Sequence, residues 1–284
     1  MSAYPIRFGI QTPQQHTTWP QILSLWQEID RLGYDTAWLF DHFLPIFSDP
    51  TGPCLEGWTA LSALATATKK VRLGLMVTGN TYRHPAVLAK MATTVDIISG
   101  GRLILGIGAG WFEQEHQEYG IPFHTTGGRL RRLEETLEII KRLWTEERAN
   151  FSGRYHELRN ASFNPKPFQQ PRPPILIGAS GENMALGIVA RHGQMWNSFG
   201  TPDVFRHKIE RLNDHCERAG RDPASIEKSV LLSGQFPLNE ARRQIDEYVA
   251  TGVTHLIFSL SASVKSDREY VRRFAAEVIP AYKR

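Results

Sequence analysis

The sequence predicts one domain, spanning residues 1–284, that folds as a (β/α)8 barrel. Its 284 residues are 41% hydrophobic and 22% charged, which is typical of a globular protein with a substantial core. Short apolar or β-branched segments alternate with longer amphipathic segments along the whole chain. Eight such pairs follow one another, and eight consecutive βα units can close into a barrel.

Each predicted strand is a short apolar run that is followed by a helical pattern. A barrel of this kind places its reactive groups at the carboxyl ends of the strands. The eight predicted strands are residues 6–12, 36–42, 71–77, 102–109, 174–180, 195–200, 227–234 and 254–260.

The predicted helices carry their apolar residues on one face. In residues 19–33 the apolar side chains between Ile22 and Ile29 share one stripe, and the helix is expected to end at Gly33. Residues 131–144 and 268–282 show the same pattern.

One segment breaks this rhythm. Residues 150–174 are rich in Pro, Gly and Asn and show no clear period, so they predict a long excursion between the fourth helix and the fifth strand. A doubly wound parallel sheet is the alternative fold, because it shares the βα alternation and differs only in strand order.

Composition excludes several classes of function. The net charge of +4 comes from 33 basic and 29 acidic residues that are mixed along the chain, which does not favour nucleic-acid binding. No apolar stretch approaches the roughly 20 residues that cross a membrane, and no signal peptide is recognisable, so a cytoplasmic protein is expected. Cys54 and Cys216 form no metal-binding or redox motif.

The stretch "LILGIGAGWFEQEH" from Leu103 contains three alternating glycines. A dinucleotide-binding fingerprint has the spacing GxGxxG and opens a helix, whereas Gly106, Gly108 and Gly110 end the fourth strand and Trp111 follows them. We therefore interpret the glycines as places where a flat ligand approaches the backbone, the alternative being a tight corner of the barrel.

A metal site is not expected. Charged side chains follow only two of the predicted strands, so a metal would have to be held almost entirely by Asp41, His42, Glu113, Glu115 and His116. The other strand ends carry amides, hydroxyls and glycines, which suit an organic cofactor with many hydrogen-bonding groups.

Small residues after the fifth strand suggest a place for a phosphate. Gly178, Ala179, Ser180 and Gly181 lead into a helix that is expected to begin near Glu182, where free backbone N–H groups bind anions. An ordinary turn with Ser180 as the helix N-cap is the alternative reading of these residues.

Three motifs together resemble the bacterial luciferase-like monooxygenase superfamily. They are "LFDHF" from Leu39, "RHPAVLAKMATTVDIISGGRLILGIGAGW" from Arg83 and "PPILIGASGENMALGIVARHGQMWNSFG" from Pro173. Within the superfamily the chain looks most like the oxidoreductases that use the deazaflavin coenzyme F420. The resemblance spans nearly the whole chain and implies a barrel with a planar ring at its carboxyl-terminal mouth.

The resemblance also implies roles for individual residues. Asp41 and His42 match the acidic residue and the histidine beside the ring, and both are expected to be catalytic. Met76 and Val77 match a position where relatives have a non-prolyl cis peptide. The expected cofactor-binding residues are Asp41, Met76, Val77, Gly79, Asn80, Ala109, Gly110, Gln114, Gly178, Ala179, Ser180, Gly181, Asn197 and Ser198.

The chain departs from the family pattern at two places. Gln194 and Met195 stand where relatives often have an Asp-Gly pair, and Trp111 stands where some relatives have a catalytic Glu. These differences leave His42 as the expected proton partner.

The expected activity is hydride transfer between C5 of F420 and a small organic substrate, with the proton exchanged at a histidine. Two alternatives stay open, an FMN-dependent monooxygenase and a flavin-binding barrel without catalytic activity. The expected partner is a small molecule, with neither nucleic acid nor membrane involved. The substrate and a homodimeric state are not decided by the residues.

Overall fold

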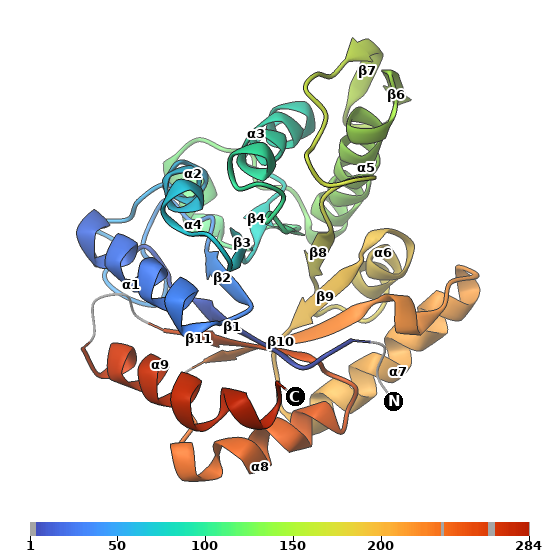
Figure 1. Ribbon diagram of the computed structural model, residues 1–284. Helices are drawn as coiled ribbons and strands as arrows, with labels where there is room; N and C mark the ends of the chain where they lie inside the picture. Colours follow the sequence, from blue (N-terminus) through green and yellow to red (C-terminus); the bar gives the residue numbers. More distant parts are fainter. Residues whose placement is uncertain (1–3, 234–235, 261–264, 284) are drawn as a thin grey trace.

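The computed structural model describes residues 4–233, 236–260 and 265–283, and it forms a closed parallel barrel surrounded by helices (Figure 1). All eight predicted strands are present, and their starts and ends lie within two residues of the prediction at all but two places. The second strand ends earlier than predicted, at Leu39, and the fourth begins later, at Leu105. Gly234 of the seventh predicted strand lies outside the described residues. The barrel strands are β1 (Arg7–Gln11), β2 (Thr36–Leu39), β3 (Arg72–Leu75), β4 (Thr78–Gly79), β5 (Leu105–Gly108), β8 (Ile175–Gly178), β9 (Met195–Ser198), β10 (Glu227–Ser233) and β11 (His255–Ser259).

The strand order proves that the sheet closes. The order is β3-β2-β1-β11-β10-β9-β8-β5-β4, and β3 and β4 are two parts of the same barrel strand, separated by residues 76 and 77. Leu73 on β3 also donates to the Arg102 carbonyl at 3.1 Å and accepts from the Ile104 N–H at 2.9 Å, which joins β3 to the approach of β5. The predicted (β/α)8 barrel is confirmed, and the doubly wound alternative is wrong.

Helices cover the outside of this barrel (Figure 1). The predicted helix at 19–33 is confirmed, with Gly33 in the left-handed conformation (φ 79°) as its C-cap. The α-helices are α1 (Trp19–Leu32), α2 (Gly57–Ala67), α3 (Pro85–Ile98), α4 (Glu113–Glu118), α5 (Thr126–Thr145), α6 (Met184–His192), α7 (Pro202–Arg218), α8 (Leu238–Val249) and α9 (Lys265–Glu277). Two short 3-10 helices are η1 (Pro223–Ser225) and η2 (Ile279–Ala281).

Two apolar layers stabilise the barrel. The larger layer lies between the sheet and the helices, where alternate strand residues meet the apolar stripes of the helices. The smaller layer fills the barrel interior with large side chains from different strands. Its buried members are Trp38, Met76, Ile104, Leu176, Met195 and Ile257.

The predicted excursion at 150–174 contains regular structure that the sequence did not reveal. An antiparallel pair, β6 (Arg148–Ser152) and β7 (Glu157–Ser162), projects beside α5 (Figure 1). Most residues of both strands are exposed, so they lack the apolar alternation that identifies a half-buried strand. Glu135 of α5 holds the turn by accepting hydrogen bonds from the N–H groups of residues 154–156.

Candidate active site

The predicted site residues gather at the carboxyl ends of the barrel strands. Because all the barrel strands are parallel, residues that follow β2, β4, β5, β8 and β9 lie at one mouth of the barrel. In the strand order, β2 and β9 stand on opposite sides of this mouth, with β8 next to β9. Residues after β2 and residues after β8 and β9 therefore face the same mouth from opposite sides.

Asp41 is a buried carboxylate beside a buried arginine. Arg83 donates to Asp41 Oδ2 at 2.7 Å and to Glu56 Oε1 at 2.6 Å, and the Gly79 N–H donates to Asp41 Oδ2 at 3.2 Å. Asp41 Oδ1 is buried and accepts no hydrogen bond from the described residues. Burial raises the pKa of Asp41 to about 6 even though Arg83 opposes this effect.

His42 forms a pair with Glu115, a residue of the short helix α4. His42 Nδ1 lies 2.9 Å from Glu115 Oε2, and the Glu115 side chain is fully buried. No described residue makes a hydrogen bond to His42 Nε2, and the histidine side chain is 12% exposed. The pair leaves Nε2 as the ring nitrogen that can meet a ligand.

The other contacts of Glu115 show which ring nitrogen of His42 carries a proton. Tyr82 Oη donates to Oε2 at 2.6 Å, while the N–H groups of Phe43 and Leu44 donate to Oε1. Burial favours the neutral acid, but the hydrogen bonds from His42, Tyr82 and Phe43 outweigh it and lower the pKa of Glu115. Because an ionised carboxylate can only accept, Nδ1 of His42 carries a proton.

A second histidine fixes α4 to the barrel. His116 is fully buried, and its Nδ1 donates to the Phe112 carbonyl at 2.8 Å. Its Nε2 lies 2.8 Å from Thr81 Oγ1, so the Thr81 hydroxyl donates to it. These contacts hold Glu115 at the place where it meets His42.

Aromatic side chains surround the His42 ring. Ring centroids of Phe40, Trp111 and Phe112 lie 5.1, 5.5 and 5.7 Å from it, all in edge-to-face geometry. Trp111 is 52% exposed and stacks at 5.6 Å on Phe47, which is 92% exposed. Among the described residues, these three are the aromatic rings that contact His42.

The peptide between Met76 and Val77 is cis, as the resemblance implies. Gln11 Nε2 donates to the Met76 carbonyl at 3.0 Å. The Val77 side chain packs against two glycines, because a Cβ at Gly108 or Gly178 would lie 2.8 or 3.0 Å from Val77 Cγ2. These glycines therefore make room for Val77.

The alternating glycines in β5 and just after it mainly serve packing within the protein. A Cβ at Gly106 would lie 2.0 Å from the Leu75 carbonyl oxygen, so only glycine fits beside β3. Gly110 has φ +78°, and a Cβ there would lie 2.9 Å from Thr81 Oγ1. The interpretation that Gly106 admits a flat ligand is wrong, and the tight-corner alternative describes it.

Asn80 uses its side chain to join the strands to α5. With the amide in the orientation that satisfies both its groups, Nδ2 donates to the carbonyls of Gly108 and Ala109 at 3.2 and 3.0 Å. The amide oxygen then accepts from the Leu133 N–H at 2.9 Å. A contact of Asn80 with the cofactor stays a prediction, and in this structure its amide is already occupied.

Two further predicted ligands also have partners within the protein. Gln114 is exposed on α4, where its Nε2 donates to Glu118 Oε1 at 2.8 Å. Asn197 is buried and donates through Nδ2 to Ser229 Oγ at 2.9 Å. Their roles toward a cofactor also stay predictions.

The loop of residues 179–183 follows β8, and α6 begins at Met184 rather than near Glu182. Ser180 is not the N-cap of this helix, since its Oγ lies 3.1 Å from Ser198 Oγ at the end of β9. The helix therefore starts later than predicted, and the hydroxyl of Ser180 is turned toward β9.

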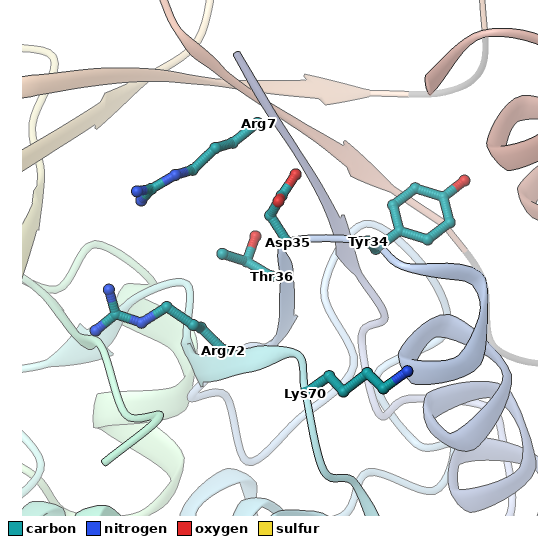
Figure 2. Close-up of a pocket in the computed structure, with 6 residues that line it drawn as sticks. All are labelled: Arg7, Tyr34, Asp35, Thr36, Lys70 and Arg72. Atoms are coloured by element: carbon teal, nitrogen blue, oxygen red, sulfur yellow. The ribbon is translucent and has the colours of Figure 1, made fainter. Parts of the chain in front are cut away.

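A cavity of about 250 Å³ lies at the opposite end of the barrel. The first residues of β1, β2 and β3, which are Arg7, Thr36 and Arg72, form part of its lining. Figure 2 shows that the guanidinium groups of Arg7 and Arg72 point to the same side. Arg7 pairs with Glu227 at 3.2 Å and Arg72 donates to Gln169 at 2.9 Å. Because it opens at the amino ends of the strands, this cavity is separate from the mouth that holds His42.

The described part of the chain shows neither a candidate metal site nor a membrane-spanning helix. No group of three or more His, Cys, Asp or Glu side chains is placed there so that it could hold a metal ion. Among the helices of residues 4–233, 236–260 and 265–283, none is both long and apolar enough to cross a membrane.

Sequence reasoning missed the role of Glu115 and of Arg83. The sequence indicates Glu115 only as a possible metal ligand, although a carboxylate that follows a glycine-rich strand end can equally pair with His42. Arg83 lies in the turn between β4 and α3, and its position in the motif shared with the family is the available signal.

Comparison with known proteins shows the family of the chain. The family model described as luciferase-like monooxygenase matches residues 2–280. An F420-dependent glucose-6-phosphate dehydrogenase of Microbacterium testaceum (strain StLB037) is 31% identical over 221 residues, which are 76% of this chain and 64% of that protein. The same enzyme of Kineococcus radiotolerans (strain ATCC BAA-149 / DSM 14245 / SRS30216) is 30% identical over 242 residues, 84% of this chain and 70% of that protein.

Solved structures show the same fold. An F420-dependent secondary alcohol dehydrogenase, solved with an F420-acetone adduct, superposes with a TM-score of 0.88 at 17% identity and covers 99% of this chain and 100% of that one. The F420-dependent tetrahydromethanopterin reductase of Methanopyrus kandleri gives a TM-score of 0.84 at 19% identity, with 99% and 100% covered. The chain belongs to the luciferase-like monooxygenase family.

Proposed function

We propose that the protein is an F420-dependent oxidoreductase that moves a hydride between the deazaflavin ring and a small alcohol or carbonyl substrate. The observation that carries the proposal is the His42–Glu115 pair at the mouth of a luciferase-like barrel. Relatives named F420-dependent glucose-6-phosphate dehydrogenase support the choice of cofactor. An alcohol and its carbonyl differ by one hydride and one proton, and one histidine can exchange that proton.

The residues at the mouth fit such a cofactor. Asp41 Oδ1 and Thr78 Oγ1 are buried without a hydrogen-bond partner among the described residues, so both can bond to polar groups of a ring or its side chain. The 179–183 loop, on the other side of the mouth, offers backbone N–H groups to a phosphate. A planar ring with a long phosphorylated side chain spans such a layout.

The bound deazaflavin would supply a carbon centre, C5, that accepts or donates a hydride. His42 Nε2 would then hold or release the proton of the substrate oxygen. Glu115 orients the ring of His42 through Nδ1–H and stabilises its protonated form. Phe40, Trp111 and Phe112 limit the access of water to this proton.

The experiment is a turnover assay with F420 and a panel of small alcohols, including glucose 6-phosphate and secondary alcohols. Absorbance of the oxidised ring should fall with at least one alcohol and should fall much more slowly in His42→Ala. Turnover with FMN and oxygen but not with F420 would instead assign a monooxygenase. A protein that binds F420 and turns over no member of a broad panel would support the non-catalytic alternative.

A further inference from the structure

A lysine lies buried next to the 179–183 loop. Lys208 belongs to α7 and is only 9% exposed, although lysine is rarely buried unless it is paired. Its Nζ donates to Ser198 Oγ at 3.2 Å, and Ser198 Oγ lies 3.1 Å from Ser180 Oγ. This chain of contacts places the ammonium beside the loop that follows β8.

The ammonium of Lys208 has no carboxylate partner among the described residues within 4.0 Å. Its neighbours are the Ser198 hydroxyl and the ring of Phe199, whose centroid lies 5.6 Å from Nζ. Glu182 is the nearby acidic residue, but its carboxylate faces His207 Nε2 at 3.2 Å. Burial lowers the pKa of Lys208, and Glu182 opposes this only in part.

An ammonium has three N–H donors, and a single neutral acceptor leaves most of its hydrogen-bonding capacity unused. A buried charge without an opposite charge is costly. An anionic ligand bound at this place would supply the opposite charge.

Most backbone N–H groups of the neighbouring loop also have no acceptors within the described part of the protein. The Ala179 N–H donates to the Asn197 carbonyl at 3.0 Å, but the N–H groups of residues 180–183 donate no hydrogen bond to the described part of the protein. These groups lie just before α6, whose N-terminal end favours negative charge. A Cβ at Gly181 would meet only Ala185 Cβ, at 3.7 Å, so the space above the loop is open.

We propose that Lys208 is the cationic ligand of the cofactor's phosphate, which it binds together with the hydroxyls of Ser180 and Ser198 and the N–H groups of the 179–183 loop. This inference rests on the proposed function, since it takes the anion to be the phosphate of F420. A phosphorylated substrate offers the same chemistry. We favour the cofactor because the loop lies across the mouth from His42, where the distal end of an elongated cofactor would lie.

The test compares F420 with its dephosphorylated analogue, which keeps the ring and the ribityl chain. Dissociation constants come from fluorescence titration, without turnover. Wild-type protein should bind F420 more tightly than the analogue. Lys208→Met should weaken F420 binding by about 10- to 100-fold and leave analogue binding unchanged, as expected for one charge-assisted contact. Lys208→Gln, which keeps a donor to Ser198 without the charge, should behave in the same way.

Arg206→Gln is the matched control, because it also removes one positive charge from the same helix. The Arg206 side chain is 56% exposed. This variant should bind both compounds like the wild type. Apo Lys208→Met should unfold at the same temperature as the wild type or higher, because a buried unpaired charge has been removed.

Equal weakening of F420 and analogue binding in the Lys208 variants, or a lower unfolding temperature with unchanged F420 affinity, would overturn the proposal. Selective loss of glucose 6-phosphate binding relative to glucose, with F420 binding intact, would assign the lysine to a substrate phosphate instead. Wild-type protein that binds neither F420 nor its analogue would contradict the proposed function itself, separately from the role of Lys208.

Discussion

Replacing Glu115 by glutamine changes one atom and should disable His42. In the wild type Oε2 accepts from His42 Nδ1 at 2.9 Å and from Tyr82 Oη at 2.6 Å, and Oε1 accepts from the N–H groups of Phe43 and Leu44. An amide nitrogen cannot accept, so either of its two orientations places N–H groups against donors. Tyr82 can rotate its hydroxyl, but His42 can adapt only by losing the Nδ1 proton.

The size of the effect follows from these contacts. Loss of one charge-assisted hydrogen bond costs about 1.5–3 kcal/mol, which corresponds to a roughly 10- to 150-fold slower chemical step. If His42 also adopts the tautomer with its proton on Nε2, the loss can approach about 10⁴-fold. Affinity for F420 should stay within a few-fold, because Glu115 is fully buried and contacts only protein groups.

The assay is rapid mixing of F420-loaded protein with substrate, at saturating cofactor. Glu113→Gln is the control, since Glu113 lies on the same helix and is exposed. A folded Glu115→Gln protein that transfers hydride at the wild-type rate would refute the positioning role of Glu115.

Stability should respond to pH as well. Because the folded-state pKa of Glu115 is lowered, its ionised form stabilises the fold above the usual glutamate pKa of about 4.3, and this contribution is lost as pH falls below that value. Glu115→Gln should therefore lower the free energy of unfolding by about 1–3 kcal/mol at neutral pH. The difference from the wild type should narrow in acid, and a difference independent of pH would contradict this account.

Three further outcomes are expected. His42→Ala should slow the chemical step by about 10²- to 10⁴-fold in rapid-mixing experiments with little change in F420 affinity, whereas weaker binding at an unchanged rate would make His42 a packing residue. Asp41→Asn should remove a pH dependence of the free energy of unfolding. Because the folded-state pKa of Asp41 is raised to about 6, its ionised form destabilises the wild type by about 3 kcal/mol. This destabilisation is absent below about pH 4 and complete above about pH 6. Gly181→Val has room in the protein, because a Cβ there meets only Ala185, but its side chain would occupy the space above the loop. It should therefore weaken the binding of F420 far more than that of the dephosphorylated analogue in fluorescence titrations. Equal weakening of both would mean that the loop is an ordinary turn.

The barrel could be predicted from the sequence because its signals are local. A buried parallel strand is a short apolar run, and each run here is followed by an amphipathic segment, so the eight units can be counted without knowing any contact. The exposed β6 and β7 lack this signal, because their side chains mostly meet solvent on both faces. The start of α6 was placed too early because small residues and Glu182 resemble a first helical turn.

The site could be predicted only in part. Asp41 and His42 can be predicted because they lie close to the end of a strand and match the family motif, and the family resemblance also indicates the cis peptide at Met76. The partnership of His42 with Glu115 spans 73 positions, and the contact of Lys208 with Ser198, which in turn lies beside Ser180, depends on how α7 packs beside β9. Neither distance is encoded in spacing along the chain.

The central claim is that this mouth binds a deazaflavin in preference to a flavin. The most direct measurement is a parallel equilibrium titration of the apoprotein with F420 and with FMN, followed by fluorescence, with oxygen uptake recorded after each ring is reduced. Tighter binding of F420 and no oxygen uptake are the results that the account expects. Tighter binding of FMN, accompanied by oxygen consumption with reduced FMN, would contradict it and identify a monooxygenase.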